Sequence, residues 1–259
     1  MELRDKVAVI TGGGGGIGRA MARAFLDEGA RAVVLADLSE DAVQAAAKEL
    51  GCDGIACDVT NEQQVVALVD RTLEKYGRID LFCSNAGAGG KGLLTDAKNE
   101  VWQKQWELHV MAHLYAARAV LPSMIAQGNG YLLNTASAAG LLAAMGSGPY
   151  TVTKAAAVKL AEFLSITHAD EGIKVSVLCP QGVNTAMAPR SMGDGQTDGV
   201  IEPEALAQTV VAALKEERFH VLPHPEVEEY VRRKGNDIDR WLGGMQRLRR
   251  RSLGDEQTQ

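Results

Sequence analysis

A tyrosine and a lysine four residues apart, Tyr150 and Lys154, are the residues of this sequence best suited to proton transfer. On a helix this spacing places both side chains on one face, where the ammonium can lie close to the phenol. A nearby cation favours the phenolate. Moving a phenol pKa from about 10 to near 7 nevertheless requires roughly 4 kcal/mol, more than one exposed pair supplies. A second positive charge or a dry pocket must therefore contribute.

The same spacing occurs a second time, at Tyr230 and Lys234. The residues that precede each pair must therefore distinguish the two. Thirteen residues before Tyr150 is Ser137, a hydroxyl just beyond a predicted buried strand, whereas the second pair follows a charged helix end. Open α/β sheets bind ligands outside the carboxyl ends of their strands. We therefore take Ser137, Tyr150 and Lys154 as the candidate catalytic group, and the second pair as a solvated helical face.

A glycine-rich turn lies near the start of the chain. Residues 6–10 are an apolar run typical of a strand, and the turn after them precedes a helical pattern. The turn contains Thr11, Gly12, Gly16, Ile17 and Gly18. A phosphate needs close backbone approach and free N–H groups at the positive end of a helix, and a Cβ in the turn would block it. The order strand, glycine turn, helix predicts phosphate binding rather than an ordinary loop.

A carboxylate closes the next predicted strand, residues 32–36. Asp37 follows Gly18 by 19 residues, where it can accept hydrogen bonds from a ribose 2′-hydroxyl and would repel a 2′-phosphate. Leu38 comes next, and the glycine turn holds no Arg or Lys for an extra phosphate. These residues favour NAD as the cofactor, and its oxidised nicotinamide would supply the positive charge that Tyr150 needs. In the alternative interpretation, Asp37 is a turn residue that caps the following helix.

Two more predicted strands end in small or polar residues. Residues 55–57 run into Asp58 and Val59, and Thr60 with Gln63 has the pattern of a capping box at the start of a helix. The strand at residues 79–84 is followed by Asn85, Ala86 and Gly87. Such residues suit close packing against a cofactor.

Strands alternate with helices along the chain. This order predicts an α/β fold, a Rossmann-type doubly wound parallel sheet of about seven strands with helices on both faces. A length of 259 residues with 46% hydrophobic content allows one large core. Because no linker interrupts the pattern, we expect a single domain over residues 1–259.

Composition narrows the class of protein. The net charge of -6 disfavours a nucleic-acid surface, and no apolar run reaches membrane-spanning length. The first strand begins without a signal-peptide pattern. The four cysteines show neither CxxC pairing nor ligand spacing with His, so we expect reduced thiols and a cytoplasmic location.

One long helix is predicted from Asn99 to Gln127, broken or kinked at Pro122. His109 and His113 lie four residues apart on it, as in a metal-binding pair. No acidic third ligand is patterned with them, so no metal site is expected.

A predicted strand at residues 174–179 is followed by another candidate motif. It comprises Pro180, Gln181, Gly182, Val183, Asn184 and Thr185. The irregular stretch at residues 187–203 is interpreted as a lid over the pocket, with an inert surface loop as the alternative. A charged helix is expected to end near Leu242. Residues 243–259 would then form a frayed basic tail, with binding of an anionic ligand or a neighbouring subunit as the alternatives.

These residues together resemble a known family. From roughly Leu3 to Leu222 the chain is similar to the short-chain dehydrogenases/reductases, whose TGxxxGIG, NAG and PGxVxT motifs occur here in order. The resemblance implies catalysis by Ser137, Tyr150 and Lys154, with Asp58 on the adenine side. It implies cofactor contacts at Gly12, Gly16, Ile17, Gly18, Asp37, Asp58, Val59, Asn85, Ala86, Gly87, Tyr150, Lys154, Pro180, Val183 and Thr185.

Two positions depart from the family pattern. His109 stands where the family has a catalytic asparagine whose main-chain carbonyl is implied to hold a relay water. A backbone carbonyl can do this on any residue, so we place His109 with the catalytic residues and expect an altered proton relay. Gln181 replaces the usual glycine of the PGxVxT segment.

The function predicted is hydride transfer between a secondary alcohol or ketone and NAD. Tyr150 would be the general base or acid, Ser137 would bind the substrate oxygen, and Lys154 would lower the phenol pKa and hold the nicotinamide ribose. Two alternatives remain: an NAD-binding regulator with altered catalysis, and an epimerase or dehydratase that uses NAD transiently. The pocket candidates, residues 88–94, 141–148 and 187–192, are small or apolar and favour an uncharged substrate.

The family also implies a homotetramer, with a dimer as the alternative. The helices that begin near Asn99 and Tyr150 would form the dimer faces. Apart from a small-molecule substrate we expect no other partner, neither nucleic acid nor membrane.

Overall fold

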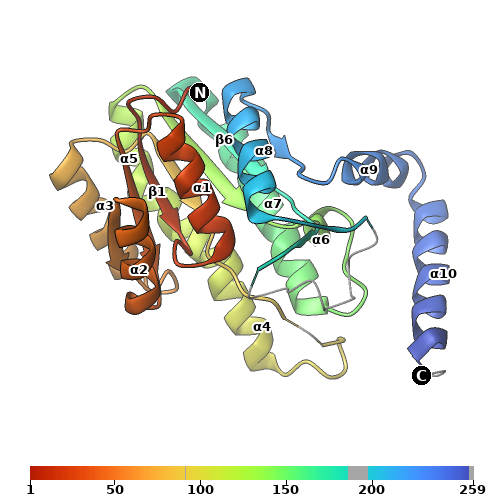
Figure 1. The fold of residues 1–259 in the computed structure, drawn as a ribbon. Helices are drawn as coiled ribbons and strands as arrows, with labels where there is room; N and C mark the ends of the chain where they lie inside the picture. The colour runs from red at the N-terminus through yellow and green to blue at the C-terminus, as the bar shows by residue number, and fades with distance from the viewer. Residues whose placement is uncertain (91, 186–197, 257–259) are drawn as a thin grey trace.

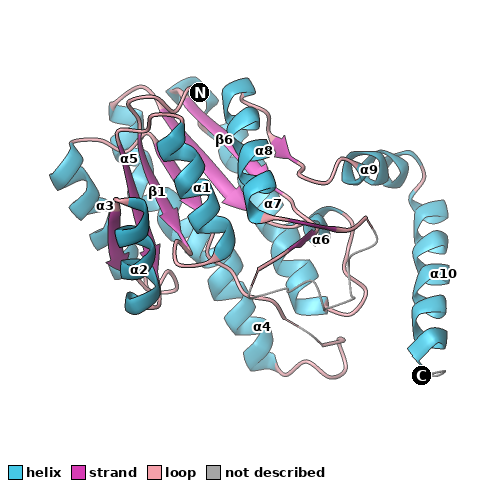
Figure 2. Ribbon diagram, in the orientation of Figure 1, coloured by secondary structure: helices cyan, strands magenta, loops and turns pink. Residues whose placement is uncertain are grey.

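The computed structural model describes residues 1–90, 92–185 and 198–256. Its centre is a parallel sheet of seven strands in the order β3-β2-β1-β4-β5-β6-β9 (Figures 1 and 2). These strands are β1 (Val7–Thr11), β2 (Ala32–Asp37), β3 (Asp53–Ala56), β4 (Leu81–Ser84), β5 (Gly130–Thr135), β6 (Ile173–Leu178) and β9 (His220–Val221). A separate parallel pair is made by β7 (Gly182–Val183) and β8 (Val200–Ile201).

Helices cover both faces of the sheet (Figure 2). Helices α1 (Gly16–Asp27), α2 (Glu40–Leu50) and α8 (Pro203–Glu216) enclose one core. Helices α3 (Glu62–Tyr76), α5 (Ala112–Ala126) and α7 (Gly148–Thr167) enclose the other. The other α-helices of the described ranges are α4 (Asn99–Trp106), α6 (Ala138–Leu141), α9 (Glu226–Asn236) and α10 (Ile238–Glu256), and a short 3-10 helix spans Ala169–Glu171. No helix in the described ranges is both long and apolar enough to cross a membrane.

The central strands are apolar because both of their faces are covered. All five residues of β1 and all six of β5 are buried, as expected for strands of a parallel sheet packed between two helical layers. The chain moves outward from β1 through β2 to β3, then returns to β4 on the other side of β1. The predicted doubly wound fold is therefore confirmed, and its switch point lies between β1 and β4.

The predicted capping box at the start of α3 is wrong. The N-cap is Asn61, whose side chain accepts a hydrogen bond from Gln64 N. Thr60 is engaged elsewhere, because both its N–H and its hydroxyl donate to Asp58 Oδ1 at 2.9 and 2.7 Å. Thr60 is therefore hydrogen-bonded within the turn after β3 and does not cap α3.

The helix predicted over residues 99–127 is present, and it is not broken at Pro122. A π-helical turn, Glu107–Met111, joins α4 to α5, and α5 continues through Pro122. Proline inside a helix costs about 3 kcal/mol, which burial of the neighbours Val120, Leu121 and Met124 offsets.

The carboxyl-terminal residues also differ from expectation. Helix α9 ends at Asn236, and α10 runs on to Glu256, so the described part of the expected tail is helical. Figure 1 shows α10 standing away from the sheet, reached through α9. Apolar residues at helical spacing continue past Leu242 to Met245 and Leu248, and the Gly243–Gly244 pair does not end the helix.

Candidate active site

The glycine-rich turn lies between the end of β1 and the start of α1. Gly12 has φ +66°, a left-handed conformation that favours glycine. A Cβ added to Gly18 would lie 2.3 Å from the carbonyl oxygen of Gly12, so the turn closes on itself too tightly for a side chain. Because α1 begins at Gly16, the free N–H groups of its first turn face this loop. The turn can accept an anion at close range.

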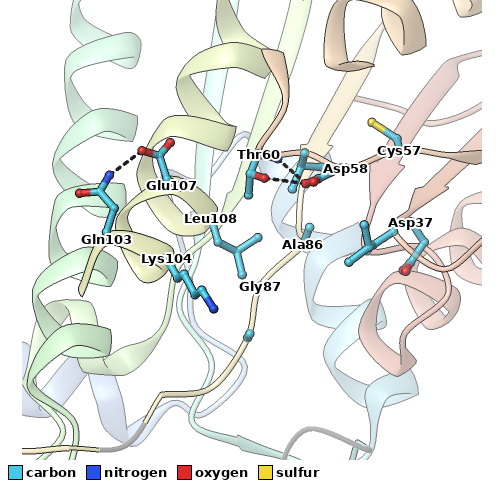
Figure 3. Close-up of a pocket in the computed structure, with 14 residues that line it drawn as sticks. Asp37, Cys57, Asp58, Thr60, Ala86, Gly87, Gln103, Lys104, Glu107 and Leu108 are labelled. Carbon is cyan, nitrogen blue, oxygen red and sulfur yellow. Dashed lines mark hydrogen bonds between the residues drawn. The ribbon is translucent and has the colours of Figure 1, made fainter. Parts of the chain in front are cut away.

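A cavity of about 500 Å³ extends from this turn along the carboxyl edge of the sheet (Figure 3). Its walls include Gly12, Asp37, Leu38, Cys57, Asp58, Val59, Ala86, Gly87 and Leu108. The cavity therefore collects residues from the ends of β1, β2, β3 and β4 on one wall and from the α4 region on the other. Its volume is within the range of small-molecule sites.

Asp37 forms one end of the cavity wall. Its Oδ2 accepts a hydrogen bond from Gly14 N at 3.0 Å, and its Oδ1 accepts one from Ser39 N at 3.1 Å. The carboxylate therefore joins the glycine turn to the end of β2. It does not cap α2, whose N-cap is Ser39. The alternative interpretation, in which Asp37 is a turn residue that caps the next helix, is therefore correct about the turn and wrong about the cap.

The segment after β4 is tied to both neighbouring strands. Thr11 Oγ1 accepts hydrogen bonds from Asn85 N at 2.9 Å and Ala86 N at 3.1 Å. The Asn85 side chain donates to Thr11 O at 2.9 Å and accepts from Thr135 Oγ1 at 3.2 Å. These bonds fix the backbone of Gly87 at the cavity wall.

Ser137, Tyr150 and Lys154 meet beyond the end of β5. The Ser137 hydroxyl is close enough to the Tyr150 phenol to lower its pKa, and it donates a hydrogen bond to Pro180 O at 3.4 Å. Lys154 Nζ lies 5.7 Å from the centre of the Tyr150 ring and donates to Thr135 O at 2.9 Å. A Cβ on Gly87 would lie only 3.5 Å from the same Nζ, so the group borders the cavity wall.

In the polypeptide without a cofactor, burial is the main influence on the pKa values of Tyr150 and Lys154. It raises the pKa of Tyr150 above its ordinary value, against the opposing effect of the Ser137 hydroxyl. It also lowers the pKa of Lys154 to about 8. Lys154 therefore does not make the phenol acidic on its own, in contrast to the direction that the pair alone would give. The need for a further positive charge follows from this balance.

His109 lies in the π-helical turn and is fully buried. Its Nε2 accepts from Ala88 N at 3.3 Å, and its Nδ1 lies 3.0 Å from Thr153 Oγ1, which donates to Pro149 O. The network thus assigns the proton to Nδ1. The ring stands edge-on to Tyr150 at 5.4 Å, and burial together with Lys154 holds the pKa of His109 far below its ordinary value.

His109 and His113 do not form a metal pair, because both ring nitrogens of His109 are hydrogen-bonded to protein groups. Within the described ranges no group of three His, Cys, Asp or Glu side chains is placed to hold a metal ion. Thr153, which the sequence analysis missed, anchors His109. Its only sequence signal is its place between Tyr150 and Lys154.

The segment after β6 faces the glycine turn. A Cβ on Gly16 would lie 3.0 Å from Thr185 Cγ2, and Ala138 N donates to Pro180 O at 2.9 Å. Val183 is buried in β7. The proposed lid and the pocket candidate at residues 187–192 fall largely on residues 186–197, outside the described part of the chain.

The second tyrosine and lysine are not a solvated face. Tyr230 donates to Asp198 Oδ1, and Lys234 donates to the main-chain oxygen of Leu141, at the end of α6. Both residues are partly buried. Long-range contacts of this kind leave no pattern in local sequence, which is why the helix looked solvated.

A family model for short chain dehydrogenase matches residues 6–194. Uncharacterized oxidoreductases of Staphylococcus haemolyticus (strain JCSC1435) and Staphylococcus aureus (strain USA300) are each 35% identical over 216 residues, covering 82% of this chain and 92% of theirs.

Solved structures give the same result. A short chain dehydrogenase/reductase from Burkholderia phymatum in complex with NAD is 32% identical, with a TM-score of 0.84, covering 92% of this chain and 96% of that one. Levodione reductase is 27% identical with a TM-score of 0.77, covering 85% of this chain and 95% of its own.

Proposed function

This chain belongs to the short-chain dehydrogenase/reductase family of oxidoreductases, and on that premise we propose that it transfers hydride between a secondary alcohol or ketone and NAD. One observation carries the proposal. Ser137, Tyr150 and Lys154 meet beside the wall of a cavity whose other end is formed by a glycine turn and Asp37. Such an arrangement would provide proton transfer at one end and dinucleotide binding at the other.

The cavity residues fit NAD. The turn at Gly12 and Gly18 excludes side chains and would receive the phosphates at the positive end of α1. Asp37 would accept hydrogen bonds from the adenosine ribose and repel a 2′-phosphate, while Asp58 and Val59 would line the adenine side. The similar Burkholderia structure contains NAD, which supports this preference.

When bound, the dinucleotide would accept or supply the hydride. Tyr150 would take the proton of the alcohol as the hydride leaves its carbon, or return a proton to the ketone oxygen in the reverse direction. Ser137 would donate a hydrogen bond to that oxygen and hold it against the phenol. Each turnover thus moves one hydride and one proton, and Tyr150 ends protonated after oxidation.

Lys154 would bind the nicotinamide ribose and act on the phenol. Only one of its three N–H groups is used by Thr135 O, so donors remain that can reach the ribose and the Tyr150 oxygen. Burial raises the phenol pKa, so the ammonium and a cationic nicotinamide together would bring it down. Cofactor binding would therefore activate the base.

We propose that His109 positions this group instead of exchanging protons with the substrate. Its two ring nitrogens connect Thr153, in the helical turn between Tyr150 and Lys154, to the backbone of Ala88. The ring stays neutral near pH 7 because burial depresses its pKa. The relay carbonyl implied by the family resemblance would still be available on its main chain.

The substrate proposed is uncharged and moderately apolar. The pocket candidates at residues 88–94 and 141–148 are mostly small or apolar in sequence, while residue 91 and residues 187–192 lie outside the described part of the chain. A cytoplasmic enzyme is consistent with four unpaired cysteines.

A homotetramer, or alternatively a dimer, is also proposed. Its support is the apolar face that α7 leaves exposed at Val152, Phe163 and Ile166, 48, 60 and 80% accessible, with Trp106 on α4 also exposed.

The test is a panel of alcohols and ketones assayed by NADH absorbance with NAD and NADP in parallel. We expect turnover with NAD, and a loss of at least about a hundredfold in Tyr150→Phe, while calorimetry still detects NAD binding by that variant. Substrate oxidation retained by Tyr150→Phe would refute the role of Tyr150.

The same panel separates the alternatives. A regulator would bind NAD and turn over no substrate, whereas an epimerase or dehydratase would convert substrate without net NADH release.

A further inference from the structure

Helix α9 contacts two segments that follow the ends of β5 and β6. One is the segment after Ser137, which includes α6. The other begins at Gln181 and includes β7 and β8. Asp198, Tyr230 and Lys234 make these contacts, and all three lie beyond residue 194, where the family match ends.

The contact to α6 is made by one side chain. Lys234 Nζ donates a hydrogen bond to the main-chain oxygen of Leu141. Leu141 is the last residue of α6, where carbonyl groups lack partners within the helix and favour a cation. Two residues later, Ala143 has φ +108°, a strained conformation for a residue with a side chain. The lysine thus satisfies a carbonyl next to a strained turn.

The contact to the β7–β8 segment passes through Asp198. Its Oδ1 accepts from the Tyr230 hydroxyl at 2.9 Å and its Oδ2 accepts from Gln181 Nε2 at 2.9 Å. The carboxylate is therefore held from both sides. The glycine usual at position 181 would offer no side-chain donor, so the departure from the family motif has a structural role here.

Two more residues support the same contact. His224, just before α9, is 2% exposed, and its Nδ1 accepts from Gln181 N at 3.2 Å. Trp241, in the first turn of α10, packs on the Tyr230 ring with centroids 6.2 Å apart. The hydroxyl of Tyr230 is thus aimed by packing on one side and by Asp198 on the other.

We propose that Tyr230 and Lys234 are positioning residues that set the two walls of the substrate pocket. The set Gln181, Asp198, Tyr230, Lys234 and Leu141 forms a C-terminal clamp that connects α9 to the Ser137 side and to the Gln181 side at once. This proposal rests on the proposed function, because it assigns the substrate side of the same site. None of the clamp residues lines the cavity at the glycine turn, so we assign the clamp to the substrate side of the site.

The first test is hydrogen exchange followed by mass spectrometry, which requires no turnover. Lys234→Met removes the donor to Leu141, and Tyr230→Phe removes only the hydroxyl. A hydrogen bond contributes about 0.5–1.5 kcal/mol, so exchange should accelerate roughly two- to tenfold, in residues 138–148 for Lys234→Met and in 198–201 for Tyr230→Phe. Lys234→Arg keeps a donor and should exchange like the wild type.

Arg233→Met is the matched control. Arg233 lies on α9 and pairs with Glu229, four residues earlier, and is among the exposed residues of that helix. It should leave exchange in both segments unchanged. Unchanged exchange in both clamp variants, or equal acceleration in Arg233→Met, would overturn the proposal.

The second test uses the best alcohol from the panel. We expect Lys234→Met to raise KM for that alcohol about two- to tenfold, with KM and Kd for NAD unchanged. A parallel loss of NAD affinity in Lys234→Met would mean a general loss of structure and would contradict the clamp. If no alcohol is turned over, the proposed function fails, while hydrogen exchange and NAD titration still decide whether the clamp exists.

Discussion

Replacing Lys154 by methionine should stabilise the protein near neutral pH, and the gain should disappear in alkali. The Lys154 side chain is buried, with 3% of the residue exposed, and its ammonium donates a hydrogen bond to the neutral carbonyl of Thr135. Burial lowers the pKa of Lys154 from 10.5 to about 8, which at about 1.4 kcal/mol per pKa unit makes the protonated side chain cost roughly 3 kcal/mol. Methionine removes that cost and loses a hydrogen bond of about 1–2 kcal/mol.

The direction of the pH effect follows from proton binding. Between pH 8 and 10.5 the unfolded chain keeps the Lys154 proton while the folded chain releases it, so stability of the wild type rises with pH in this window. The cost of the lysine is therefore about 3 kcal/mol at pH 7 and about 1 kcal/mol at pH 10. Lys154→Met should be more stable by about 1–2 kcal/mol at pH 7 and equal or less stable at pH 10.

Urea unfolding of both proteins without added cofactor, at pH 7, 8.5 and 10, measures this difference. Because the same protein is compared with one variant, other groups that titrate in alkali largely cancel. Lys159→Met is the control, since Lys159 is on the same helix and 76% exposed at its side chain. Its difference from the wild type should not change with pH by more than a few tenths of a kcal/mol. A Lys154→Met difference that is constant, or that grows with pH, would refute the reasoning.

Three further predictions concern the cofactor site and His109. Gly18→Ala places a methyl group 2.3 Å from Gly12 O, so we expect a loss of about 1–3 kcal/mol in urea unfolding and weaker NAD binding by calorimetry; wild-type values would contradict the tight turn. Asp37→Ala should weaken NAD binding about ten- to a hundredfold and NADP binding much less, because hydrogen bonds to a carboxylate contribute about 1.5–3 kcal/mol; an equal loss for both would remove Asp37 as the selector. His109→Leu should lower kcat by a larger factor than it changes KM, and His109→Asn should recover activity. His109→Leu should also resist acid unfolding better than the wild type, because only the unfolded chain protonates His109 as pH falls below about 6.5.

Local pattern was sufficient for most of the fold. Short apolar runs ending in Thr11, Asp37 and Ser84, each followed by a turn and a helical pattern, predicted a parallel sheet because such runs need both faces covered. The prediction failed where a side chain can form either of two hydrogen bonds. Thr60 has the pattern of a helix cap, yet Asp58 engages it, and proximity in space decides between these bonds.

The candidate site was predicted to a similar extent. The spacing of Tyr150 and Lys154 placed them on one face of a helix, and the structure brings Ser137 to them. The protonation of the group did not follow from spacing. Burial raises the phenol pKa and lowers that of the amine, and burial depends on elements distant in sequence.

The amino-acid sequence by itself determined the order of strands and helices, the glycine turn and the pair of residues suited to proton transfer, because each depends on neighbours within a few positions. Tertiary structure alone decided that Tyr230 and Lys234 contact Asp198 and Leu141, while an identical spacing forms the candidate catalytic pair. The physical reason is that a hydrogen bond between residues 93 positions apart, as from Lys234 to Leu141, depends on where the folded core brings the backbone.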